Sequence, residues 1–198
     1  MRNFNYLLWL CIALVSINLV SCSQDDDYDN ETNISTRAID GIYTFPLVSE
    51  IVKSDIVKKQ MEEAWSKMKS NASEKGRSEY GFFIYYDHDK QTYSCGSIVA
   101  GPVVSGCIDT NASISLGIPT DNKTVCAFFH CHTTLEYCPA DNSRKTGPSD
   151  SDKNYANKMN LPGILYDYSA STIYGGQSKN SAYKIYTFGP NKRPDMPY

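Results

Sequence analysis

The sequence has no surplus of basic residues. Its 198 residues include 19 Lys and Arg against 22 Asp and Glu, so the formal net charge is -3. Proteins that bind nucleic acid usually carry a basic surface that neutralises backbone phosphates, so nucleic acid is not an expected partner. The sequence contains no internal repeat. Its hydrophobic fraction of 41% and charged fraction of 21% exclude a wholly disordered chain and predict one folded domain.

The sequence also lacks an apolar run long enough to span a bilayer. Its longest one, Tyr6–Val20, covers 15 residues, follows a single positive charge and is interrupted by Asn18. This layout is typical of a secretory signal peptide, predicted here at residues 1–21, although an uncleaved helical anchor is an alternative. The end of the run, Leu19 to Cys22, resembles the lipobox of bacterial lipoproteins. The resemblance implies that Cys22 is lipidated and that the membrane is a partner through this lipid anchor.

The segment expected to follow the signal peptide covers residues 22–44; within it, residues 23–40 contain almost no apolar residues and include the acidic run Asp25-Asp26-Asp27. Such a segment cannot bury enough surface to offset the entropy of ordering, so it predicts an extended tether before a domain at residues 45–198. The acidic run after the lipidated cysteine resembles the surface-export signal of Bacteroidota-type lipoproteins, although any polar linker would serve as a tether. The expected location is the outer membrane, facing either the cell surface or the periplasm.

No two of the seven cysteines form a CxxC pair, which argues against a four-cysteine structural zinc site. Outside the cytoplasm thiols tend to form disulfides. Cys95 and Cys107 lie on either side of the turn Gly101-Pro102 and are one candidate pair. Cys131 and Cys138 are another, but sequence alone leaves the connectivity open.

Hydrophobic periodicity predicts an α+β domain with a mostly antiparallel sheet. A long amphipathic helix is expected at 45–71, and a second helix at 150–160, opened by Ser149-x-x-Asp152. Residues 133–146 are rich in turn-forming residues and predict a loop. Strands are expected at 79–86, 92–100, 112–118, 125–132, 164–168, 171–174 and 183–188.

Histidine is scarce, and two of the three histidines stand in His130-Cys131-His132. Alternate residues of a strand share a face, so His130 and His132 should project to the same side, about 7 Å apart, with Cys131 pointing away. Imidazole nitrogens are good zinc ligands, and Asp152 in the first turn of the following helix is the best candidate for a third ligand. Three protein ligands leave one position open, which is the catalytic pattern of zinc coordination.

Two further residues suit hydrolysis at such a zinc ion. Glu79, at the start of a predicted strand, could act as general acid and base, although Glu74 is a nearby competitor. Ser149 could donate a hydrogen bond to the oxyanion of a tetrahedral intermediate. The motif Ser149-x-x-Asp152 also has a simpler reading as a helix cap, and His88, in the turn Asp87-His88-Asp89, is expected to be solvated.

Together, Glu79 before a hydrophobic strand, His130-x-His132 ending another, and Ser149-x-x-Asp152 opening a helix resemble the JAMM motif of the MPN/JAB metalloprotease family. The segment Glu79–Tyr85 with Gly147-Pro148-Ser149 looks most like a bacterial secreted branch of JAB-like proteins. The resemblance implies a JAB/MPN-like domain with cytidine-deaminase-like layering. It also implies zinc held by His130, His132 and Asp152, and hydrolysis of peptide or isopeptide bonds in a peptide or protein substrate.

Two positions depart from the family pattern. Thr133 stands where the family usually has proline, and 20 residues separate His132 from Asp152, more than the family usually has. An inserted loop around Cys138 and Pro139 explains the interval, because extra loop length costs little closure entropy. The alternative function is a non-catalytic envelope lipoprotein that uses the same fold as a binding module.

Overall fold

The computed structural model describes residues 42–107, 112–119, 124–176 and 182–197. The expected signal peptide, Cys22 and most of the expected tether lie outside these residues. Within the described part of the chain, no helix is both long and apolar enough to cross a membrane.

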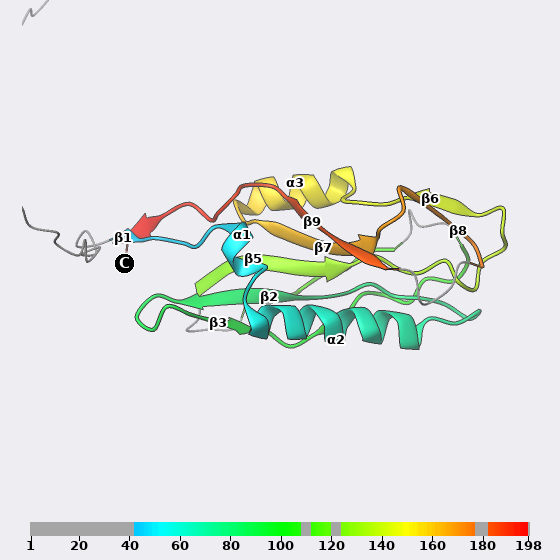
Figure 1. Ribbon diagram of the computed structural model, residues 1–198, viewed down its shortest axis with the longest axis horizontal. Helices are drawn as coiled ribbons and strands as arrows, with labels where there is room; N and C mark the ends of the chain where they lie inside the picture. Colours follow the sequence, from blue (N-terminus) through cyan, green and yellow to red (C-terminus); the bar gives the residue numbers. More distant parts are fainter. Residues whose placement is uncertain (1–41, 108–111, 120–123, 177–181, 198) are drawn as a thin grey trace, which may run out of the picture. The chain divides into compact units, whose positions relative to one another are not determined.

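The described residues form a mixed α+β fold with few helices and a mostly antiparallel sheet (Figure 1). The helices are α1 (Val48–Ile51), α2 (Asp55–Asn71) and α3 (Asp150–Met159). The first strands are β1 (Ile42–Tyr43), β2 (Tyr80–Asp87), β3 (Thr92–Cys95), β4 (Val99–Ala100) and β5 (Thr124–Cys131). The remaining strands are β6 (Ser143–Lys145), β7 (Gly163–Tyr168), β8 (Thr172–Tyr174), β9 (Tyr183–Phe188) and β10 (Met196–Pro197).

The central sheet has six strands in the order β3-β2-β5-β7-β9, with β4 paired to β2 beside β3. Only the pairing between β5 and β7 is parallel, and α3 lies in the connection between them. Two small two-stranded sheets, β1-β10 and β6-β8, lie outside the central sheet, and isolated antiparallel bridges join Ser73 with Gly76 and Arg77 with Val104. The apolar strand β5 is therefore the middle of the sheet, as its near-continuous apolar content predicts.

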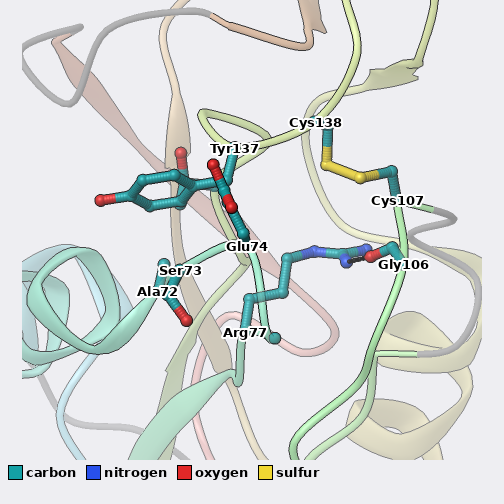
Figure 2. A pocket seen from close by; sticks show the side chains of 10 residues that line it. Ala72, Ser73, Glu74, Arg77, Gly106, Cys107, Tyr137 and Cys138 are labelled. Atoms are coloured by element: carbon teal, nitrogen blue, oxygen red, sulfur yellow. Dashed lines mark hydrogen bonds between the residues drawn. A yellow bond between two sulfur atoms is a disulfide. The ribbon is translucent and has the colours of Figure 1, made fainter.

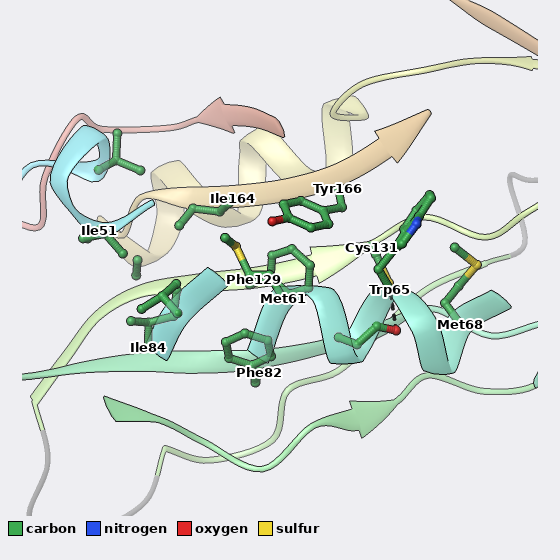
Figure 3. Close-up of a cluster of buried hydrophobic side chains, with 14 of the residues drawn as sticks. Ile51, Met61, Trp65, Met68, Phe82, Ile84, Phe129, Cys131, Ile164 and Tyr166 are labelled. Carbon is green, nitrogen blue, oxygen red and sulfur yellow. Dashed lines mark hydrogen bonds between the residues drawn. The ribbon is translucent and has the colours of Figure 1, made fainter. Parts of the chain in front are cut away.

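Alternate side chains of the central strands pack on opposite faces of the sheet. On one face, Phe82, Phe129 and Tyr166 pack against Met61 and Trp65 of α2 (Figure 3). On the other face, residues of the same strands pack with Ala156 of α3, and this second cluster comprises Phe83, Tyr85, Val125, Phe128, Leu161, Leu165 and Phe188. The domain thus has a helix on each side of its sheet, and the side on which a residue lies decides which helix it meets.

The expected single helix over 45–71 is instead two helices, α1 and α2. They are separated at Val52–Ser54, where Ser54 is extended (φ -65°, ψ 127°) and acts as the N-cap of α2. Serine is more common at helix N-caps than inside helices, because its hydroxyl competes for backbone hydrogen bonds. The apolar periodicity continues across the break because Ile51 and Val57 are both buried in the same core, so periodicity alone could not reveal it.

Several strand predictions also need correction. Residues 92–100 form two strands, β3 and β4, because residues 96–98 between them are not part of a strand. Residues 112–118 form no strand: Ala112, Ile114 and Leu116 are half-buried while the serines between them are exposed, so the alternation reflects packing without backbone pairing. The expected loop 133–146 contains β6, whose partner β8 is remote in sequence. Ile42–Tyr43, expected in the tether, pair with Met196–Pro197.

The disulfide joins Cys107 to Cys138, with 5.6 Å between the two Cα atoms. Both expected pairings, Cys95 with Cys107 and Cys131 with Cys138, are therefore wrong. Cys131 is a buried free thiol on the α2 side of the sheet, where its Sγ contacts the backbone oxygen of Ala64 at 3.8 Å (Figure 3). Cys95 lies in β3 and is half-buried. The disulfide connects two segments outside the central sheet, a contact that sequence spacing does not indicate.

Candidate metal site and its surroundings

His130 and His132 lie at the end of β5 on the face of the sheet that α3 covers. His130 lies among the aromatic rings of that face, stacked near Phe128 and edge-on to Phe188. The two imidazole rings are 5.2 Å apart between centroids, so the same-face prediction for the histidines is confirmed. Cys131 faces α2 on the other side, as strand alternation predicts.

Asp152 reaches the histidines from the first turn of α3. Ser149 is the N-cap of this helix and accepts a hydrogen bond from the Asp152 backbone N–H at 3.1 Å, while the Ser149 N–H donates to Asp152 Oδ2 at 2.7 Å. This reciprocal capping box holds the carboxylate in one orientation. The long chain segment between His132 and Asp152 therefore does not separate the two residues in space.

The three side chains form a compact cluster of potential ligands. Asp152 Oδ1 lies 3.2 Å from His130 Nε2, and Asp152 Oδ2 lies 3.3 Å from His132 Nε2. One ligand atom from each residue can be chosen so that all lie within 4.8 Å of one another, and the group could therefore hold a metal ion. Two nitrogen or oxygen ligands of a tetrahedral zinc ion, each about 2.0–2.1 Å from it, lie about 3.3 Å apart. Each histidine–aspartate separation is close to this value, with a different oxygen of Asp152 in each pair.

The Nε2 atom of His130 gives a second reason to expect an ion here. The atom is buried and lies 3.2 Å from Asp152 Oδ1, but it makes no geometrically regular hydrogen bond among the described residues. A buried polar atom without a partner is unfavourable. A cation between His130, His132 and Asp152 would satisfy it, so the residues present fit a metal.

Glu79 lies on the same side of the sheet as the histidines. In the antiparallel pairing of β2 with β5, Tyr80 is opposite Cys131 and Gly81 is opposite His130, so Glu79, one residue further on, falls opposite His132. Directly opposed residues project to the same face. Glu79 is also buried, with 8% of its surface exposed, whereas Glu74 is exposed as expected. The pairing of β2 with β5 ends at Tyr80, and its continuation by one residue, together with burial, distinguishes Glu79 from the exposed Glu74.

Gly81 makes room beside His130. A Cβ atom at residue 81 would lie 2.4 Å from the backbone oxygen of Phe129 and 3.0 Å from the Cβ of His130. Both neighbours are fixed by the strand ladder and neither can move away. The glycine was not identified from the sequence as part of the site, although its position two residues after Glu79 was a usable signal.

Asp167, on β7, is the most important residue that sequence reasoning missed. Its side chain is fully buried, and its Oδ2 lies 3.0 Å from Nδ1 of His132. Arg144 donates to both of its oxygens at 2.7 Å. Asp167 stands in an otherwise apolar strand, Gly163–Tyr168, and a charged residue inside such a run was the available signal.

Two arginines hold Thr133, the residue that follows His132. Arg77 Nε donates to Thr133 Oγ1 at 2.8 Å, and Arg144 donates to the Thr133 carbonyl at 2.9 Å. Arg77 also donates to the carbonyl of Gly106 next to the Cys107–Cys138 disulfide, beside a small pocket (Figure 2). The chain just beyond His132 is therefore fixed on both sides by charged side chains.

The charges of the cluster shift its pKa values strongly. Burial alone would lower the pKa of His132, but Asp152 and Asp167 outweigh burial and raise the pKa to about 10. Burial would raise the pKa of Asp152, yet the two histidines hold the pKa well below its usual range. For Asp167, burial is likewise outweighed by His132 and Arg144, and the pKa is lowered. Both carboxylates are therefore ionised at neutral pH and attract a cation.

The structure also shows the surroundings of Ser149 and His88. Ser149 Oγ donates to Asp152 Oδ2 at 2.8 Å, so the hydroxyl serves the helix cap and the aspartate in this structure. His88 is not solvated as expected: its ring stacks on Tyr43 with 4.3 Å between centroids and meets Phe45 edge-on. The reason is tertiary, because β1 brings Tyr43 over a turn that in sequence appears exposed.

Comparison of the chain with protein-family models, with curated proteins and with solved structures found no match.

Proposed function

We propose that the protein is a zinc-dependent hydrolase of peptide or isopeptide bonds, with a JAMM-like site on a JAB/MPN-like domain. The observation that carries the proposal is the cluster of His130, His132 and Asp152, because it assembles two imidazoles and a carboxylate from two remote elements at metal-ligand separations. Nitrogen and oxygen donors of this kind, three in number, match a catalytic rather than a structural zinc site. When bound, zinc supplies Lewis acidity and activates a water molecule.

The residues of the chain supply the rest of the chemistry. Glu79, opposite His132, would take a proton from the attacking water and return it to the leaving amine, which is the role of a general acid and base. The low exposure of the ligands supports such a site, since side-chain exposures are 3% for His130, 11% for His132 and 18% for Asp152. A site so well shielded from water strengthens electrostatic stabilisation of the reaction.

We further propose that the protein is a lipoprotein anchored through Cys22, with its domain at the bacterial envelope. The support is the lipobox-like sequence and the acidic segment that follows it. The substrate would then be a peptide or protein that reaches the outer membrane or the cell surface.

A binding module without catalysis is the second candidate, and one observation favours it. The Ser149 hydroxyl donates to Asp152 and would have to change rotamer to stabilise an oxyanion. In a binding module, the cluster of His130, His132 and Asp152 would hold a metal ion that organises a binding surface.

Metal analysis is the direct test of the proposal. The full chain, purified in detergent with zinc in the buffer and then freed of excess metal, is expected to contain one zinc ion per molecule by mass spectrometry. His130→Ala and His132→Ala should each abolish it. Absence of stoichiometric metal in the unaltered chain would overturn both the hydrolase and the metal-organised binding module.

A further inference from the structure

The hydrogen bonds around Asp167 determine which nitrogen of His132 keeps its proton when the imidazole ring is neutral. Oδ1 of Asp167 accepts from Arg144 at 2.7 Å and from the Tyr168 N–H at 2.8 Å. Oδ2 accepts from Arg144 at 2.7 Å and from the Gly147 N–H at 2.9 Å. Guanidinium and backbone N–H groups can only donate. The carboxylate is thus an acceptor for every neighbour, and its remaining contact, with His132 Nδ1, must also be donated to it.

This arrangement leaves His132 Nε2 as the atom available to an ion. An imidazole that donates from Nδ1 keeps its lone pair on Nε2 once any second proton is displaced. His132 Nε2 is the atom that faces Asp152. Carboxylates that accept a hydrogen bond from a metal-binding histidine in this way fix its tautomer and the direction of its ring.

Resting on the function proposed above, we infer that Asp167, held by Arg144, is a positioning residue that prepares His132 to bind zinc through Nε2. Arg144 is a suitable partner because its planar guanidinium binds both carboxylate oxygens and fixes the plane of the carboxylate. The same arginine donates to the carbonyl of Thr133, so it ties the orienting carboxylate to the chain next to His132. Asp167 itself does not touch the metal.

Replacing Asp167 by asparagine tests this role with almost no change of shape. The new amide NH₂ would face donors in either orientation. On the Oδ1 side it meets Arg144 and the Tyr168 N–H, neither of which can become an acceptor. On the Oδ2 side, only His132 can, and it does so by moving its proton to Nε2 and losing the lone pair that the metal needs. Zinc affinity should therefore fall about 10- to 100-fold.

The experiment measures zinc affinity by competition with a chromophoric chelator on the full chain in detergent. The control is Tyr166→Leu, at the neighbouring position of β7 but on the α2 face, where Tyr166 stacks on Tyr183. It should lower thermal stability and leave zinc affinity unchanged. An Asp167→Asn protein that is less stable but binds zinc as tightly as the unaltered chain would show a merely structural role and overturn the inference.

A second measurement needs no variant. Long-range ¹H–¹⁵N spectra of the zinc-loaded chain should show His132 protonated at Nδ1 and bound to metal through Nε2, and only three histidines need assignment. Coordination through Nδ1 would overturn the inference while the hydrolase proposal stands. If zinc binds and depends on Asp167 but no peptide is cleaved, the hydrolase proposal fails and the positioning role stands. Failure of the unaltered chain to bind zinc overturns both.

Discussion

At the scale of single residues, Glu79 decides between catalysis and binding. Glu79→Gln keeps the size of the side chain but removes the group that accepts a proton. We expect the variant to retain one zinc ion and to lose hydrolysis of a library of quenched fluorescent peptides by about 10²- to 10⁴-fold. Metal content and peptide cleavage are measured on the same preparations.

Glu74→Gln is the matched control, because Glu74 lies five residues earlier and is exposed. It should leave cleavage unchanged. Equal loss in both variants, or loss of zinc in Glu79→Gln, would contradict the assignment of Glu79 as general acid and base.

Gly81 provides a test of how tightly the site is packed. Gly81→Ala places a methyl group against the backbone of β5 beside His130, and such overpacking typically costs about 1–3 kcal/mol of unfolding free energy. The loss is measured by urea denaturation of the metal-free chain. Gly96→Ala is the control, since a Cβ there meets no atom closer than 3.4 Å; equal stability of the two variants would show that β5 can shift.

At the scale of secondary-structure elements, the reactivity of the thiols tests how deeply the cysteines of β3 and β5 are buried. Burial raises the pKa of Cys126 to about 12 and also raises that of Cys131. At pH 8 both therefore remain protonated, with about one thiolate in 10⁴ for Cys126, and thiolate is the reactive form. Iodoacetamide should label the half-buried Cys95 in the native chain and label Cys126 and Cys131 only after unfolding. Peptide mass mapping that finds Cys131 labelled in the native chain would contradict its placement against α2.

The elements also show where periodicity is informative. Helix α3 was predicted well because Ser149 and Asp152 form a local capping box, and local hydrogen bonds follow from adjacent residues. Hydrophobic periodicity, by contrast, predicts a single helix over 45–71, because the buried face continues through the break at Ser54. Strand β6 was missed because its short polar sequence, Ser143–Lys145, is a strand only by virtue of its partner β8.

At the scale of the whole molecule, the Cys107–Cys138 disulfide should stabilise the domain substantially. It closes a loop with a sequence separation of 31 residues, for which the chain-entropy model gives about 3–4 kcal/mol. The Cys107→Ser, Cys138→Ser double variant should lose about this amount in urea denaturation, and reduction of the unaltered chain should cause a similar loss. Cys95→Ser, which removes a thiol outside this disulfide, is the control. A double variant as stable as this control would exclude a stabilising disulfide.

The sequence by itself determined the α+β class, the helix that opens at Ser149, and the shared face of His130 and His132. Each of these follows from a short-range rule: side-chain alternation, helix periodicity or a local cap. The proximity of Asp152 to the two histidines was also predictable, because Asp152 lies at the start of the helix that follows the strand of His130.

Only the tertiary structure decided the surroundings of these ligands. Asp167 reaches His132 through the parallel pairing of β5 with β7, and Cys107 meets Cys138 through the packing of two loops. Gly81 matters because β2 pairs with β5 in one register. Contacts of this kind join residues that are remote along the chain, and strand register and loop packing depend on the free energy of the whole core, which no local pattern records.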